Sequence, residues 1–286
     1  MRLSERFRVE PGSHPKLRDL DAGFHENKKA AAVETEKHEE RMRQLQYLLY
    51  ADHQRSLLVV LQALDAGGKD GTISHVLAAM NPQGVRVAPF KAPTGDELAH
   101  DFLWRIHKHT PAKGEVAIFN RSHYEDVLIA RVHGLVPKKV WSRRYERINE
   151  FEKNLVQSGT TILKFYLHIS EDEQLARFEQ RLDDPMRRWK ISEADYSERK
   201  LWPAYTEAFE DVFHKTSTVH APWYIIPANH KWFRNLAVSS IVADAVDSLA
   251  LELPEPTVNI ADIRRKYHAA VKAESKKDRP TSGKRR

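Results

Sequence analysis

Apolar runs alternate with stretches of helical periodicity along this chain. Five apolar runs predict strands, at residues 57–61, 85–88, 116–119, 160–169 and 223–226. Helical periodicity predicts helices at 26–50, 73–80, 138–156, 171–182, 201–216 and 232–251. Two capping boxes, Thr94 with Glu97 and Ser170 with Glu173, predict further helix starts. The helix that Thr94 opens is expected to continue through Leu98, Phe102 and Ile106, which have helical spacing. Residues 1–23 show no periodicity and are expected to be irregular.

Strands separated by helices of this length predict βαβ units. The expected fold class is therefore α/β, with a mainly parallel sheet covered by helices on both faces. Ligands of such sheets bind at the carboxyl ends of the strands. Polar, chemically useful side chains are accordingly expected just after the strands end.

Composition narrows the class of protein. The chain has 286 residues, of which 41% are hydrophobic, enough for a sizeable core. It has no cysteine, so disulfides, thiol nucleophiles and Cys-ligated metals are excluded. The first residues lack the apolar centre of a signal peptide and no run is long enough to span a membrane, so we expect a cytoplasmic protein.

The net charge of +6 indicates a polyanionic partner. Nucleic acid, an acidic surface and a polymeric phosphate remain possible at this point. Residues 272–286 are basic and show no period, so they are interpreted as a disordered tail, with an electrostatic arm as the alternative.

The first predicted strand runs into a glycine-rich turn, and Lys69 follows Gly67 and Gly68. Backbone N–H groups of such a turn can surround phosphate oxygens, and the lysine adds positive charge at the start of a helix. The match to a P-loop is imperfect, because Ala63 replaces the first glycine and Asp70 the hydroxyl residue. Asp65, before the glycines, is a candidate Mg²⁺ ligand. The alternative is an ordinary turn.

A second polar run follows the third predicted strand. It includes Asn120, Arg121, Ser122, His123 and Glu125. A guanidinium can bind phosphate oxygens with two hydrogen bonds, and Glu125 or Asn120 can bind metal directly or through water. The alternative is a polar loop with Ser122 as a helix cap.

A basic cluster follows the fourth predicted strand. Arg177, Arg181, Arg187, Arg188 and Lys190 surround a break marked by Pro185. Such a segment is typical of a mobile lid that brings arginines to a transferring phosphoryl group. A solvated helix face is nearly as good an interpretation for Arg177 and Arg187, whereas function is favoured for the other three.

Four blocks together resemble the second family of polyphosphate kinases, the polyphosphate:nucleotide phosphotransferases. The blocks are LDAGGKDGTI, FNRSHYEDVL, RLDDPMRRWK and TSTVHAPWYIIPANHKWFRN, in that order between about residues 34 and 253. The resemblance implies a three-layer α/β/α P-loop kinase core, similar to thymidylate kinase, with a helical lid at about residues 178–200. It also implies a catalytic domain at 51–253, an N-terminal extension at 1–50 and a C-terminal extension at 254–286.

The resemblance also assigns roles to residues. Those expected to be catalytic are Asp65, Lys69, Arg121, Arg181 and Arg188. Those expected to bind phosphate or nucleotide are Ala66, Gly67, Gly68, Asp70, Gly71, Thr72, Asn120, Glu125 and Lys190. Mg²⁺, for which Mn²⁺ can substitute, is expected on Asp65, with Asn120 or Glu125 acting through water. Many family members have aspartate where this chain has Asn120, which weakens metal binding at that position.

The implied activity is transfer of the terminal phosphoryl group of polyphosphate to AMP, ADP or both. The form of the second block resembles the subgroup that phosphorylates both nucleotides, and Glu125 is the residue linked to that breadth. The resemblance further suggests a homodimer or homotetramer. An ATP-dependent nucleoside-monophosphate kinase is the alternative, and a basic nucleic-acid-binding protein is a second one, although the sequence carries no nucleic-acid-binding signature.

Overall fold

In the computed structural model, which describes residues 2–277, five parallel strands form one sheet. Their order is β2-β3-β1-β4-β5. The strands are β1 Ser56–Gln62, β2 Val85–Pro89, β3 Val116–Asn120, β4 Thr160–His168 and β5 Trp223–Pro227. β1 is buried along its whole length, as its continuous apolar sequence predicts. The expected parallel α/β sheet is therefore confirmed.

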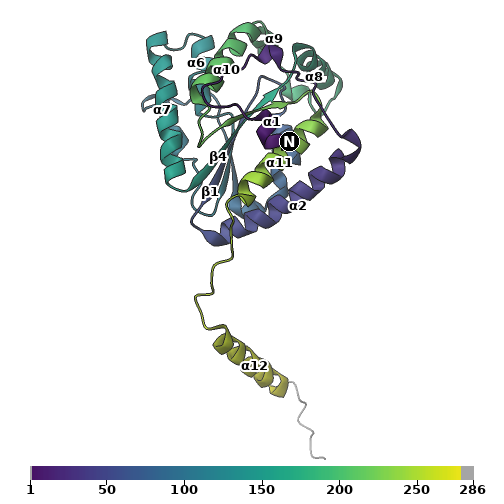
Figure 1. Ribbon diagram of the computed structural model, residues 1–286, viewed down its shortest axis with the longest axis vertical. Coiled ribbons are helices and arrows are strands. Elements are labelled where there is room, and N and C mark those ends of the chain that lie inside the picture. Colours follow the sequence, from purple (N-terminus) through teal and green to yellow (C-terminus); the bar gives the residue numbers. More distant parts are fainter. Residues whose placement is uncertain (1, 278–286) are drawn as a thin grey trace, which may run out of the picture. The chain divides into compact units, whose positions relative to one another are not determined.

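Helices cover both faces of this sheet (Figure 1). The helices before β4 are α1 Leu3–Phe7, α2 Lys28–Asp52, α3 Lys69–His75, α4 Gly95–Leu98, α5 Trp104–His107, α6 Ile129–Val132 and α7 Lys138–Gln157. Those after it are α8 Glu171–Asp183, α9 Glu193–Arg199, α10 Trp202–Thr216, α11 Lys231–Asp247 and α12 Ile260–Lys277.

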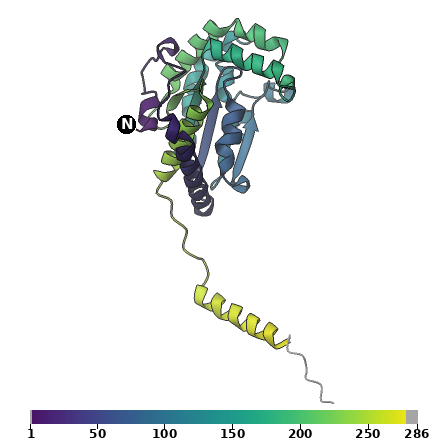
Figure 2. The same cartoon turned by 90° about the vertical axis from the view of Figure 1, so that its right-hand side faces the viewer.

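Two hydrophobic cores separate the three layers. One core joins α7 and α10 to one face of the sheet, through residues such as Phe151 and Phe213. The other joins α2 and α11 to the opposite face, through residues such as Leu49 and Val242. Figure 2 shows α2, in purple, lying alongside α11, in yellow-green. This is the expected α/β/α arrangement.

The strand order determines where the site forms. β1 pairs with β3 on one side and with β4 on the other, so the strand that leads into the glycine-rich turn lies at the centre of the sheet. The segments that follow β1, β3 and β4 consequently meet at one edge, which is the usual ligand position in sheets of this kind.

Several predicted helix boundaries were wrong. The helix expected at 73–80 begins instead at Lys69, because Gly68 adopts a left-handed conformation (φ 103°) and allows a helix to start immediately after it. It ends at His75 and is followed by a 3₁₀ turn at Leu77–Ala79. Residues 1–23, expected to be irregular, include the helix α1, whose Phe7 packs edge-to-face on Phe233.

The two capping boxes had different outcomes. The Thr94–Glu97 box is confirmed, but its helix ends at Leu98 and the periodicity continues only as the short helix α5. Ser170 accepts from the Glu173 N–H at 3.2 Å, as predicted. The carboxylate of Glu173, however, binds Arg177 Nε at 2.7 Å, so it serves the arginine four residues later instead of completing the box.

The chain divides into two compact units, Met1–Glu252 and Leu253–Arg286. The second contains α12, so residues 272–277 are helical and the prediction that they are disordered was wrong. The reason is a helical stripe of apolar residues, Ile260, Ile263, Tyr267 and Val271, that enters this helix before its basic end. The rest of the predicted tail, 278–286, lies outside the described residues.

No helix within residues 2–277 is both long and apolar enough to cross a membrane.

Candidate active site

The glycine-rich turn forms a tight loop between β1 and α3. Ala66 and Gly68 both have positive φ, at 58° and 103°, and Lys69 is the first residue of the helix. A side chain at Gly68 would collide with the buried guanidinium of Arg234. The loop therefore presents its backbone at a helix N-terminus, which is the arrangement that favours bound anions.

Lys69 is folded back along this loop. Its Nζ donates to the carbonyl of Ala63 at 2.9 Å. Burial, and after it the nearby positive charge of Arg121, lowers the pKa of Lys69 to about 8. The lysine is thus held at the loop by one carbonyl, with its charge available to an anion.

The residues after β3 lie opposite this loop. Arg121, at φ 65°, places Nη2 3.1 Å from Asp65 and Nη1 3.6 Å from Glu125. Against the effect of burial, these two carboxylates raise the pKa of Arg121. Asn120 donates to Asp70 at 3.0 Å. The structure therefore brings together two segments, one after β1 with Asp65 and Asp70, the other at the end of β3 with Asn120, Arg121 and Glu125.

The basic segment after α8 contacts the loop through one residue, Lys190. Its Nζ lies 2.9 Å from Asp70, and this hydrogen bond is the main cause of the lowered pKa of Asp70. Arg181 and Arg188 do not reach the loop: Arg181 donates to the carbonyl of Lys190 at 3.4 Å, and Arg188 to that of Leu182 at 2.8 Å. Their catalytic role remains a prediction.

Thr72 is also turned away from a ligand. It is buried, and its hydroxyl donates to the carbonyl of Gly68 at 3.2 Å, within its own helix.

A cavity of about 230 Å³ opens beside Arg121. Its walls come from the end of β1, the segment after β3, and the helices α6, α8, α9 and α10. Residues that line it include Asp65, Arg121, Glu125, Gln174, Trp202 and Tyr205. It is the part of the site with room for the acceptor group of a reaction.

Comparison with known proteins decides the family. The family model described as Polyphosphate kinase 2 (PPK2) matches residues 25–253. This chain belongs to the PPK2 family.

Named relatives extend over nearly the whole chain. The chain is 51% identical to the AMP/ADP-polyphosphate phosphotransferase of Meiothermus ruber, over 88% of this chain and 96% of that protein. It is 42% identical to the ADP-polyphosphate phosphotransferase of Rhodopseudomonas palustris, over 90% and 92%. Among solved structures, Polyphosphate Kinase 2 from Arthrobacter aurescens TC1 matches with a TM-score of 0.90 and 43% identity, over 94% of this chain and 97% of that one. The expected P-loop kinase-like fold is thereby confirmed.

Two buried arginines, Arg177 and Arg234, donate hydrogen bonds to the glycine loop. Sequence reasoning did not assign this role to either of them. Arg177 is 5% exposed and donates to the carbonyls of Ala66 at 2.8 Å and Ala228 at 2.5 Å. Arg234 is 2% exposed and donates to the Gly68 carbonyl at 3.3 Å. Burial, followed by the charge of Arg177, lowers the pKa of Arg234 to about 10.

These two arginines had different signals in the sequence. Arg177 stood in the basic cluster, but a solvated position on the helix surface was nearly as good an interpretation for it as a role in the lid. Arg234 stood in the last block of the resemblance, 166 positions from Gly68, and nothing local connects the two. Both add positive charge under a loop that would receive an anion.

The donor set fits Mg²⁺ if substrate phosphates complete its shell. Among residues 2–277, no group of three or more His, Asp or Glu side chains could hold a metal ion by itself. Mg²⁺ usually takes one or two carboxylates together with phosphate oxygens and water. Asp65 and Glu125, both beside Arg121, supply carboxylates at the mouth of the loop.

Proposed function

We propose that this PPK2-family chain transfers the terminal phosphoryl group of polyphosphate to AMP, ADP or both, with Mg²⁺. The observation that carries the proposal is the pairing of Lys69, on the glycine loop, with Arg121 on the opposite wall beside an open cavity. The relative that is 51% identical is named for transfer to both nucleotides. The resemblance of the second motif to the subgroup that accepts both supports the same breadth.

We propose that different residues bind the phosphate donor and the phosphate acceptor. The backbone of Ala66–Gly68 and the Lys69 ammonium hold the phosphate of the donor, and Arg121 orients the acceptor phosphate in the cavity. An oxygen of the acceptor attacks the terminal phosphorus in line, while the bridging oxygen leaves with the shortened polyphosphate. Such a transition state is loose, so positioning and charge neutralisation supply most of the rate. Bound Mg²⁺, held by Asp65 and Glu125, would neutralise phosphate charge.

Arg181, Arg188 and Lys190 belong to the proposed lid. In the structure only Lys190 spans the gap to the loop, through Asp70. We propose that the lid presents the two arginines to polyphosphate when the substrate is bound. The cytoplasm, where nucleotides and Mg²⁺ are plentiful, is the compartment that we propose for the reaction.

Product analysis tests the proposal directly. The protein is mixed with AMP, Mg²⁺ and polyphosphate, without ATP, and nucleotides are separated over time. We expect ADP and then ATP. Transfer to AMP only when ATP is supplied as donor would contradict the proposal and favour an ATP-dependent monophosphate kinase.

The variant Lys69→Ala tests whether the lysine of the glycine loop is needed for phosphoryl transfer. We expect turnover to fall about 10²-fold or more, by analogy with loss of one preorganised donor to developing negative charge. Lys113→Ala, a lysine on the exposed turn before β3, is the matched control and should keep its activity. Near-normal turnover of Lys69→Ala would contradict the assignment.

A further inference from the structure

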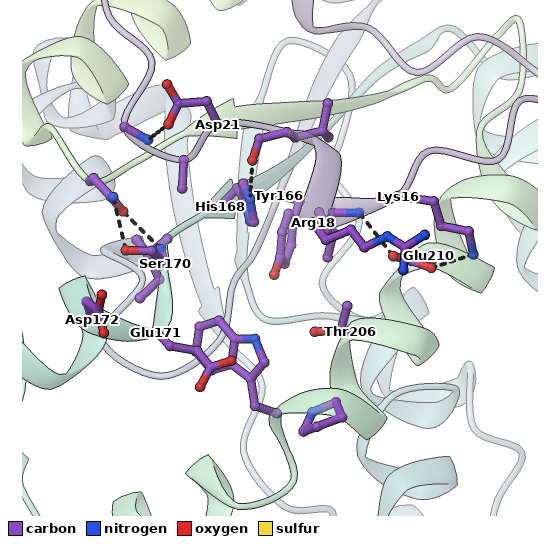
Figure 3. Close-up of a pocket in the computed structure, with 18 of the residues that line it drawn as sticks. Lys16, Arg18, Asp21, Tyr166, His168, Ser170, Glu171, Asp172, Thr206 and Glu210 are labelled. Carbon is purple, nitrogen blue, oxygen red and sulfur yellow. Dashed lines mark hydrogen bonds and ion pairs between the residues drawn. The ribbon is translucent and has the colours of Figure 1, made fainter.

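A second, larger cavity lies on the other side of α10 from the Arg121 cavity. Its volume is about 780 Å³. The N-terminal segment 16–23 forms one wall, and the end of β4 with the starts of α8 and α10 forms the rest (Figure 3). Trp202, the first residue of α10, lines both cavities. Of the four family blocks, only the last contributes a lining residue, Asn229.

Two buried polar side chains of β4, Tyr166 and His168, line this cavity. Tyr166 is 1% exposed, and no hydrogen bond to its hydroxyl is found among residues 2–277. Figure 3 shows this hydroxyl pointing into the space between Glu171 and Thr206. His168 is 8% exposed; its Nε2 lies 3.2 Å from the Leu20 carbonyl, and its Nδ1 has no partner in the described chain. Leaving such groups unpaired costs stability, and buried polar groups are normally satisfied.

The groups that face the cavity are mostly acceptors. The hydroxyls of Tyr166 and Thr206 can accept hydrogen bonds, and the lining carboxylates accept only. A ligand that satisfies them must bring N–H donors.

The charge of the lining favours a cation. Five carboxylates line the cavity against two basic side chains. Three of the five form ion pairs, Glu171 with Arg199, Glu207 with Arg131 and Glu210 with Lys16, which leaves the charge of Asp21 and Asp172. Lys16 is already paired with Glu210 at 2.7 Å, and the exposed Arg18 with Asp19 at 3.6 Å. Asp172 has no ion pair among the described residues. This is an acidic pocket on a protein whose net charge is +6.

Trp202 adds an aromatic ring to the wall, and the guanidinium of Arg199 lies over this ring, 6.0 Å from its centroid. Cations are attracted to the face of an indole ring, and carboxylates beside such a ring are the usual elements of ammonium recognition. The volume is in the range of small-molecule sites.

We propose that this cavity binds an organic polyamine through N–H donors to Tyr166 and Asp172. Binding gives a partner to the Tyr166 hydroxyl, for which no hydrogen bond is found within the described residues. This proposal is independent of the proposed phosphotransfer, because none of the residues proposed to bind polyphosphate or nucleotide takes part in polyamine binding. Through Trp202 the bound amine lies next to the cavity beside Arg121.

Isothermal titration of the full chain with spermidine tests the proposal. The titration contains neither polyphosphate nor nucleotide, since both bind polyamines, and salt is constant at about 150 mM, where screening limits nonspecific attraction. We expect saturable binding of one spermidine per chain. Tyr166→Phe should weaken it about tenfold, the effect of losing one hydrogen bond to a charged group. Asp172→Asn should weaken it as well.

Two controls separate the site from general charge and from folding. Glu36→Gln removes an equal charge from the exposed face of α2, and it should leave the affinity unchanged. Tyr166→Phe keeps the ring that packs on Phe209, and without spermidine its melting temperature should equal or exceed that of the parent.

Three results would overturn the proposal. They are the absence of saturable binding up to about 10 mM spermidine, equal affinity in Tyr166→Phe and the parent, and equal affinity for triethylene glycol, an uncharged chain of similar length. None of them would bear on phosphotransfer, which is measured separately.

Discussion

Lys69 has a lowered pKa, so its charge depends on pH near neutrality. Burial and Arg121 lower its pKa to about 8, so it is protonated below that pH and neutral above it. A neutral lysine cannot attract phosphate. The free enzyme should therefore lose affinity for polyphosphate as the pH rises through this range.

This gives a prediction for the pH profile. We expect kcat/KM for polyphosphate, which reports the free enzyme, to fall above pH about 8. Lys69→Arg should extend the plateau upward, because arginine stays protonated. A profile in the parent that stays flat to pH about 9.5 would show that Lys69 does not control binding.

Gly68 is constrained by its conformation and by its neighbour. Gly68→Ala would place a Cβ in the left-handed region and against Arg234, a guanidinium too buried to move away. We expect loss of activity and a free energy of unfolding lower by more than about 1 kcal/mol. Gly134→Ala is the matched control, because Gly134 has φ 61° but open space around its Cβ position. Equal effects of the two variants on unfolding by urea would mean that Arg234 yields to the new methyl group.

At the scale of elements, a buried polar network fixes the segment after β3. Glu152 on α7 accepts hydrogen bonds from Lys164 on β4 at 2.6 Å and from the Tyr124 hydroxyl at 2.7 Å. His123 lies 3.2 Å from the same carboxylate. Since residues 123 and 124 stand between Arg121 and Glu125, this network holds the active-site motif against two core elements.

Removing one charge from this network should be costly. Lys164→Met leaves Glu152 buried without its cation, and we expect the free energy of unfolding to fall by about 3–5 kcal/mol. The double variant Lys164→Met with Glu152→Gln should recover part of that loss, because no buried charge remains. Urea denaturation measures both. A double variant no more stable than the single one would mean that packing, not charge, dominates.

The elements also show which patterns local sequence resolves. The capping box at Thr94 formed, but the helix after it did not continue, although Leu98, Phe102 and Ile106 have helical spacing. The Asp101 side chain accepts from the Leu103 N–H at 3.0 Å, which stabilises a turn in place of a continuous helix. Here a side-chain hydrogen bond to the backbone competes with the helical hydrogen bonds. The competition involves neighbouring residues only, but the spacing of apolar residues does not reveal it.

At the scale of the whole molecule, the positive charge of the chain should act on a polyanion over a distance. Polyphosphate is a chain of negative charges, and cations that contact it release counterions, so binding weakens with salt. We expect KM for long polyphosphate to rise about twentyfold between about 50 and 200 mM salt if roughly three phosphates are neutralised. KM for AMP should change less. A KM for polyphosphate that does not depend on salt would exclude an extended basic path.

The sequence alone determined the five strands, the long helices between them and the chemistry of the glycine loop. These depend on local patterns: apolar runs for buried strands, and glycines that permit the backbone of Ala66–Gly68 to turn. Four motifs in fixed order also determined the family. The tertiary structure decided which distant residues meet there. Arg234 reaches Gly68, Arg121 finds two carboxylates, and Tyr166 faces a cavity because the sheet order and helix packing place them so. Contacts between residues far apart in the chain have no local signal, which is why the supporting arginines and the second cavity appeared only in the folded protein.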